Sequence, residues 1–375
     1  MSSRVDPNLQ REIAQFGGKD VTTCFNCGNC TAVCQLSSGD TTFPRRIIRY
    51  AQLGLKDKLL RSPEPWLCYY CGQCSSTCPR DSSPGEMMMA LRRYLTSEYD
   101  WTGLSKRLYL SWVWELGMVM AVGLAVVVLF LLFHGPVVTD HVELNTFAPV
   151  AWVELADWTL AALLAFFLLT NAYRMFRFVM SDSERIPLSV YLKELKTLFV
   201  HGLTQKQWRA CGTSTPWWKH FLLVTAYGTM FLLVVVFLRW FQTDEIRAVW
   251  HPTRLLGYYA TVILLYVTGS MMIGRLRKRD EIHKHSHFTD WMFLVLLFLT
   301  ALTGILLHAF RIVDWPLPTY SMYVIHLAIA VPMLVVEVPF GKWAHLAYRP
   351  IVLYLMKVKE RAKETPAGAE LAPAR

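Results

Sequence analysis

Eight of the nine cysteines lie within the first 105 residues, in two runs that share one spacing. The first run consists of Cys24, Cys27, Cys30 and Cys34, and the second consists of Cys68, Cys71, Cys74 and Cys78. Gaps of two residues curl the backbone so that three thiolates can face one iron–sulfur cube. The spacing therefore predicts two [4Fe–4S] clusters.

The fourth cysteine of each run points away from its own three, and this is the pattern of bacterial two-cluster ferredoxins. The ligands are therefore predicted to be exchanged: cluster one takes Cys24, Cys27, Cys30 and Cys78, and cluster two takes Cys68, Cys71, Cys74 and Cys34. Gly28 and Gly72 allow the tight turns. Pro79 directs the chain away from the site, whereas Gln35 stands at the matching position of the first run.

A pair of zinc sites is the alternative interpretation of these cysteines. Structural zinc is usually bound by two separated Cys-x2-Cys pairs. Two runs of four closely spaced cysteines fit this arrangement poorly. The N-terminus has no basic segment leading into an apolar stretch, so no signal peptide is expected. The cysteines should then stay in the reducing cytoplasm, which favours metal ligation over disulfides.

The rest of the chain is too apolar for an ordinary soluble protein, with 54% hydrophobic residues and a mean hydropathy of +0.29. A membrane-spanning helix needs about 20 apolar residues. Six candidate spans meet this criterion: 111–133, 150–171, 220–240, 254–274, 289–310 and 320–341. We expect a mainly α fold, in which a small α-helical two-cluster ferredoxin domain precedes a six-helix transmembrane bundle. The expected boundaries are 1–105 for the cluster domain, 106–350 for the membrane domain and 351–375 for a C-terminal tail.

Basic residues alternate between the loops and predict the orientation in the cytoplasmic membrane. The net charge is +10, and the loops 172–219 and 275–288 are basic, whereas 134–149 and 311–319 are not. Because basic loops stay inside, both termini and the cluster domain should be cytoplasmic. The stretch 187–209 is amphipathic and is expected along the lipid interface. The placement of the charge beside apolar runs argues against a nucleic-acid partner.

Four histidines lie at membrane depth and form two pairs. Ionisable side chains there are functional candidates, and haem iron takes an imidazole on each face. His220 and His345 share the inner level, and His308 and His326 share the outer level. The 19 residues between His326 and His345 span about 28 Å of helix, so one helix could serve two stacked haems. The alternative is that some of them only form hydrogen bonds between helices.

Two segments resemble known redox families. FNCGNCTAVC, FPRRIIRYAQLG and WLCYYCGQCSSTCP make residues 20–95 similar to the C subunit of heterodisulfide reductases. HLAIAVPMLVVEVPFGKWAHLAYRP resembles the last helix of the nitrate reductase gamma subunit, in which two histidines ligate two b haems. His326 and His345 match these ligands, and His220 matches a third. Met230 stands where that family has its fourth haem-ligating histidine. The outer haem is therefore completed by Met230 or by His308, or it is absent. We favour His308.

The fusion of these two parts resembles the C subunit of the quinone-interacting membrane-bound oxidoreductase (Qmo) of sulfate reducers. The resemblance implies an electron-transfer subunit that exchanges electrons with menaquinol or another quinone. It also implies soluble flavin- and iron–sulfur-containing partner subunits that feed adenylylsulfate reductase. A membrane anchor of a heterodisulfide reductase remains open, since nothing in the chain separates the two. A transporter with a regulatory iron–sulfur domain is a third possibility, although the spans carry few polar groups that could bind a substrate.

Overall fold

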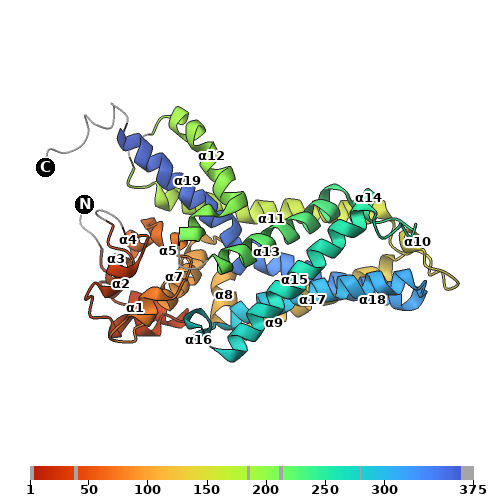
Figure 1. Ribbon diagram of the computed structural model, residues 1–375, viewed down its shortest axis with the longest axis horizontal. Helices are drawn as coiled ribbons and strands as arrows, with labels where there is room; N and C mark the ends of the chain where they lie inside the picture. The colour runs from red at the N-terminus through yellow and green to blue at the C-terminus, as the bar shows by residue number, and fades with distance from the viewer. Residues whose placement is uncertain (1–3, 38–40, 184–185, 211–213, 279, 365–375) are drawn as a thin grey trace.

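The computed structural model describes residues 4–37, 41–183, 186–210, 214–278 and 280–364. Every regular element within these residues is a helix. Figure 1 shows the cysteine-rich helices at one end and long helices that extend side by side from them. The predicted mainly α architecture, a small helical domain joined to six membrane-length helices, is confirmed.

The cysteine-rich part is built from short helices around an apolar core. These are α1 (Leu9–Gln15), η1 (Lys19–Thr23), α2 (Asn29–Val33), α3 (Arg45–Gln52), α4 (Lys56–Arg61), α5 (Glu64–Leu67), α6 (Gln73–Ser76) and α7 (Pro84–Tyr99). The longest, α7, begins with a proline in its first turn, where no backbone donor is lost. Met87 and Met88 on α7 are buried in the core.

Six helices are long and apolar enough to span a membrane, which indicates a membrane protein. They are α9 (Trp112–Phe133), α11 (Val150–Val179), α13 with the π-helical segment η3 (Thr215–Val236), α15 (Pro252–Arg277), α17 (Phe288–Ile312) and α18 (Pro316–Glu337). Each coincides with a predicted span. The second is longer than predicted, because α11 continues to Val179 and passes the buried Asn171, which donates to the backbone oxygen of Pro339.

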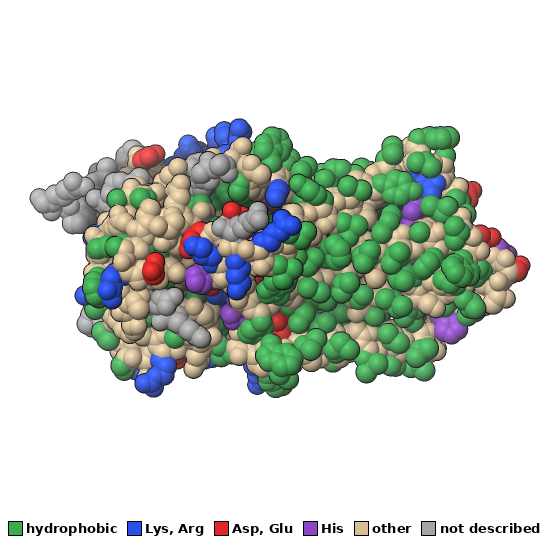
Figure 2. Space-filling view, turned by 60° about the horizontal axis from the view of Figure 1, so that its bottom comes forward, with side chains coloured by type: hydrophobic (Ala, Val, Ile, Leu, Met, Phe, Trp, Pro, Cys, Tyr) green, Lys and Arg blue, Asp and Glu red, His purple; other side chains and the backbone are tan. Residues whose placement is uncertain are grey.

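Five of these helices form a row in which α13 contacts α15, α15 contacts α17, α17 contacts α18, and α18 contacts α9. The backbones approach closely at Gly123 of α9, where an added Cβ would lie 2.7 Å from the oxygen of Ala328. Helix α11 lies beside α19 (His345–Glu364). Figure 2 shows hydrophobic side chains covering the long helices, with Lys and Arg gathered towards the cysteine-rich end.

The remaining elements are short connections and one helical pair. The connections are α8 (Leu104–Leu110), α10 (Leu144–Phe147), α14 (Leu238–Phe241), α16 (Glu281–Lys284), η2 (Lys206–Ala210) and η4 (Lys342–Ala344). The amphipathic stretch forms α12 (Leu188–Thr204), which packs along α19 (Figure 1). Residues 351–364 of the expected tail belong to α19. The rest of the tail and Cys211 lie outside the described residues.

The cysteine-rich part and the long helices share one hydrophobic core. Trp66 of α5, Tyr99 of α7 and Tyr348 of α19 meet there, with Trp66 and Tyr348 ring centroids 5.0 Å apart and those of Tyr99 and Tyr348 5.8 Å apart. The core continues into Met175 and Val179 of α11. The expected boundaries at 105 and 350 therefore fall inside α8 and α19, where the chain is helical and packed.

A partly buried group of ion pairs around Asp290 also joins the two parts. Asp290, in the first turn of α17, lies 2.5 Å from Lys342, 3.9 Å from Arg93 of α7 and 4.0 Å from Arg275 of α15. A buried carboxylate needs such partners to offset its loss of hydration. This group of ion pairs therefore holds the cysteine-rich part against the ends of α15 and α17.

Candidate iron–sulfur and histidine sites

The eight cysteines of the two runs line two cavities, four to each. One cavity contains Cys24, Cys27, Cys30 and Cys78, and the other contains Cys34, Cys68, Cys71 and Cys74. Each group combines the first three cysteines of one run with the last cysteine of the other run. This is the grouping that exchanged ligands require.

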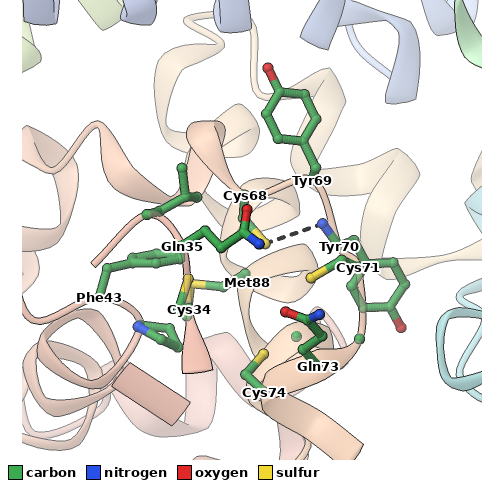
Figure 3. Close-up of a pocket in the computed structure, with 14 residues that line it drawn as sticks. Cys34, Gln35, Phe43, Cys68, Tyr69, Tyr70, Cys71, Gln73, Cys74 and Met88 are labelled. Carbon is green, nitrogen blue, oxygen red and sulfur yellow. Dashed lines mark hydrogen bonds between the residues drawn. The ribbon is translucent and has the colours of Figure 1, made fainter. Parts of the chain in front are cut away.

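The two runs have matching backbone conformations. Gly28 (φ +92°) and Gly72 (φ +83°) precede α2 and α6 in the left-handed region, which glycine enters without strain. Asn26 and Tyr70 are also left-handed, with φ of +57° and +56°. These turns aim backbone N–H groups at sulfur: the Asn26 N lies 3.4 Å from the Cys24 Sγ, and the Tyr70 N lies 3.3 Å from the Cys68 Sγ (Figure 3). Such hydrogen bonds stabilise the negative charge of thiolates.

The cavity of Cys34, Cys68, Cys71 and Cys74 is apolar and partly enclosed, with Phe43 and Met88 in its wall (Figure 3). Burial raises the pKa of the Cys34 thiol to about 11 and also raises that of Cys74. Thiolates are the metal-binding form, so ligation here must displace protons. No three Cys, His, Asp or Glu side chains in the described parts of the chain converge closely enough to hold a single metal ion. Four thiols around one cavity match the number of cysteines that a [4Fe–4S] cluster requires.

The inner histidines lie together beside this cavity. The ring centroids of His220, on α13, and His345, at the start of α19, are 6.4 Å apart, and the ring planes meet at 59°. His345 Nδ1 donates to the backbone oxygen of Lys342 over 2.5 Å, which leaves Nε2 available for a metal. Burial holds the pKa of His345 well below its usual value, so the ring stays in the neutral form that metals bind. The Nδ1 of His220 is buried and has no hydrogen-bond partner among the described residues.

The outer histidines face different helices. His326 of α18 pairs its Nδ1 with the Thr303 hydroxyl of α17 over 2.9 Å, and Gly304 leaves room beside the ring. His308 of α17 turns towards α15, where its Nε2 lies 2.8 Å from the Tyr258 hydroxyl and 3.3 Å from an Arg254 nitrogen. The third expected ligand, Met230, is partly buried against the core of the helix row.

Comparison with known proteins identifies the cysteine-rich part. Residues 20–82 match the 4Fe–4S dicluster domain family. This region therefore binds iron–sulfur clusters, as the cysteine spacing predicts. The match covers the two runs and ends before α7, so the family match does not describe the long helices. No solved structure matches this chain.

Curated relatives extend the similarity slightly beyond the domain. A protein from Archaeoglobus profundus that resembles the C subunit of heterodisulfide reductase is 35% identical over 104 residues, which cover 26% of this chain and 55% of the relative. The C subunit of an H(2):CoB-CoM heterodisulfide,ferredoxin reductase from Methanothermobacter thermautotrophicus is 37% identical over 76 residues, 20% of this chain and 41% of the relative. The iron–sulfur C subunit of a CoB–CoM heterodisulfide reductase from Methanopyrus kandleri is 31% identical over 80 residues, 21% of this chain and 40% of the relative.

This chain thus spans about half the length, or less, of the relatives it matches. Its cysteine-rich part is similar to the C subunits of heterodisulfide reductases, which by their printed names are subunits of larger reductases. The six membrane-length helices lie outside the matched region and distinguish the chain from a small ferredoxin.

Several residues beside the sites had not been expected from the sequence. Arg92 and Arg349 both donate to the backbone oxygen of the ligand residue Cys68, and Trp208 lies between Tyr69 and His220. Arg349 follows His345 by one helical turn, which is the one local signal that could have identified it. Trp208 is distant in sequence from Tyr69, so no spacing rule identifies their contact.

Proposed function

We propose that this chain is a membrane electron-transfer subunit that carries two [4Fe–4S] clusters with exchanged fourth ligands and at least one b haem. His220 and His345 would hold the haem on the side of the membrane domain nearest the clusters. The bound haem would supply one-electron chemistry between the membrane and the clusters. The chain's contribution is to fix the two imidazoles, keep them neutral and exclude water from the space around them.

The observation that carries this proposal is the spacing of the inner histidines. A metal–imidazole bond is about 2.0 Å, and the bonding nitrogen lies about 1.2 Å from the ring centroid, so two imidazoles on opposite faces of one iron have centroids about 6.4 Å apart. The ring centroids in the structure are 6.4 Å apart, so the two imidazoles are close enough to share one metal. The Nδ1 of His220 is buried without a hydrogen-bond partner among the described residues, so no hydrogen bond through this nitrogen holds the ring in place.

An outer haem between His308 and His326 is a second, separately testable part of the proposal. His326 has the features of a ligand, because its Nδ1 is hydrogen-bonded and the adjacent Gly304 leaves space. His308 would have to leave Tyr258 and Arg254 to reach the same iron. We expect His308→Ala or Met230→Leu to remove the low-spin signal of the outer haem, whichever residue is the ligand. If neither does so and one haem is found per chain, His326 is an interhelical hydrogen-bonding residue.

The electron carrier in the membrane is proposed to be menaquinone or another quinone, by analogy with Qmo, with soluble flavin- and iron–sulfur-containing subunits as the partners. In that case the electrons serve adenylylsulfate reductase. The names of the matched relatives favour a second candidate, the membrane anchor of a heterodisulfide reductase. Copurification of the partner subunits separates the two candidates, since only the second would bring heterodisulfide reductase activity with it.

The decisive experiment is a visible spectrum of the purified chain, first oxidised and then reduced with dithionite. We expect the broad absorbance of iron–sulfur clusters together with the sharp bands of a reduced b haem. Iron and sulfide analysis should give about four of each per cluster, hence about eight per chain before the haem iron is added. A preparation with full clusters and no haem bands would refute the haem proposal and leave the cluster assignment intact.

A further inference from the structure

A line of rings in contact leads from one cluster cavity to the inner histidines. Tyr69, which lies between the ligands Cys68 and Cys71, stacks on Trp208 with ring centroids 5.2 Å apart and an interplanar angle of 20°. Trp208 also meets the ring of His220, with ring centroids 4.8 Å apart. Contact is therefore continuous from a ligand run of the Cys34–Cys68–Cys71–Cys74 cavity to a proposed haem ligand.

Two arginines converge on the same ligand residue. Arg349 donates to the backbone oxygen of Cys68 over 2.7 Å and to that of Trp66 over 3.0 Å, and its guanidinium lies 4.1 Å from the ring centroid of Tyr69. Arg92, from α7, also donates to the Cys68 oxygen and to that of Pro65 over 2.6 Å. Two positive charges close to one cluster favour its reduced, more negative state.

The cavity of Cys24, Cys27, Cys30 and Cys78 also has an aromatic ring with an arginine over it, but this ring is exposed to solution. Phe25 occupies the position in the first run that Tyr69 occupies in the second, and the guanidinium of Arg80 also lies 4.1 Å from its ring centroid. Phe25 is 69% exposed, and Cys27 is exposed beside it. The ring beside the first cluster thus faces solution, whereas the ring beside the second faces the histidine pair.

We propose that the cluster held by Cys34, Cys68, Cys71 and Cys74 is the membrane-proximal one, and that the Tyr69–Trp208 stack and the Arg92–Arg349 pair connect it to the inner haem. The other cluster then exchanges electrons with the soluble partner. This inference rests on the proposed haem at His220 and His345. Arg349 is a positioning residue, because it acts on the cluster through the backbone of Cys68 and belongs to the helix that carries His345.

The electron transfer balances without a proton. A reduced haem held by His220 and His345 would give up one electron, and the cluster held by Cys34, Cys68, Cys71 and Cys74 would take it up, so that one group is oxidised as the other is reduced. The guanidinium group of arginine carries its positive charge throughout the neutral pH range. The two arginines contact the backbone of Cys68 directly, so their charges act on the potential of this cluster.

The first test is electrostatic and uses the intact chain in detergent. Arg349→Gln and Arg92→Gln should each lower the midpoint potential of the proximal cluster, followed by electron paramagnetic resonance during a redox titration. One charge within about 10 Å at an effective dielectric constant of about 20 changes the reduction equilibrium of the cluster itself on the order of tenfold. Arg349→Lys keeps the charge, so its midpoint potential should stay close to that of the wild type. Arg80→Gln is the matched control and should affect the other cluster alone.

The second test concerns the ring stack. Trp208→Leu should slow the reoxidation of reduced haem by the clusters in a rapid-mixing experiment, with haem and iron content unchanged. Trp208→Phe, which keeps a ring, should slow it less. Equal rates for the leucine variant and the wild type would overturn the inference, as would an Arg349→Gln shift in the cluster that Arg80 influences. Absence of haem from the wild-type chain is a different result, because it would refute the proposed function itself.

Discussion

The shared core makes a quantitative prediction for Trp66→Ala. The side chain of Trp66 is 2% exposed and packs against Tyr99 and Tyr348, so its removal leaves a cavity where α5, α7 and α19 meet. Tryptophan-to-alanine changes in cores cost about 3–5 kcal/mol. With an unfolding entropy of about 2.1 cal/mol/K per residue, the 375 residues give about 0.8 kcal/mol/K, so the midpoint should fall by about 4–6 °C.

The assay is thermal unfolding in detergent, followed by helical circular dichroism and by cluster absorbance. Because the cysteine-rich part and helices α11 and α19 share this core, both signals should move together to the lower temperature. Trp112→Ala is the control: this tryptophan is 59% exposed at the start of α9, and its loss should change stability by less than about 0.5 kcal/mol. Loss of cluster absorbance alone, with the helical transition unmoved, would refute a shared core.

Three further predictions follow from the sites and the orientation. Cys34→Ser should damage the cluster held by Cys68, Cys71 and Cys74 and spare the one held by its sequence neighbours, as resolved by electron paramagnetic resonance; damage to the neighbours' cluster would contradict the exchanged ligands. Reconstitution of the apoprotein should improve as the pH rises from about 7 to about 9, because burial raises the pKa of Cys34 to about 11 and thiolate formation precedes ligation; a yield that falls over this range would oppose it. Reporters at Asp140 and Asp314 should lie outside the cell and one at Lys278 inside, whereas reversed signals would invert the orientation.

The sequence predicted the features that depend on local spacing. The gaps between cysteines indicate which thiols can share a cluster, and apolar runs of membrane length indicate the six spans. Both patterns can be recognised because they involve residues that are close together in the sequence. The sequence also placed His220 and His345 close to the ends of predicted spans, and their common level in the membrane stays a prediction. The structure brings these two rings together, and it turns His308 towards Tyr258.

Contacts between distant segments could not be predicted in this way. Residues 69, 208 and 349 meet beside one cluster although long stretches of chain separate each from the next. Asp290 reads as an ordinary acidic residue in the first turn of a helix, and its burial against Lys342 and Arg93 appears only when the helices are packed. The helical character of residues 351–364 was missed because their mixed charged and apolar sequence acquires its partner, α12, only in the folded chain.

The grouping of the cysteines into two cavities has a consequence for how the protein is made. If the fourth ligands are exchanged, the cluster at Cys24, Cys27 and Cys30 lacks its fourth ligand until Cys78 has been synthesised. Cys78 follows Cys24 by 54 residues. At about 5–20 residues per second, the ribosome needs roughly 3–10 s to add this segment. Neither cube can be completed on a nascent chain that ends before residue 74, and the first needs residue 78 as well. If the fourth ligands are exchanged as proposed, the completion of both clusters has to follow the synthesis of residues 24–78, and the donor of iron and sulfide would act on this segment after it has been made.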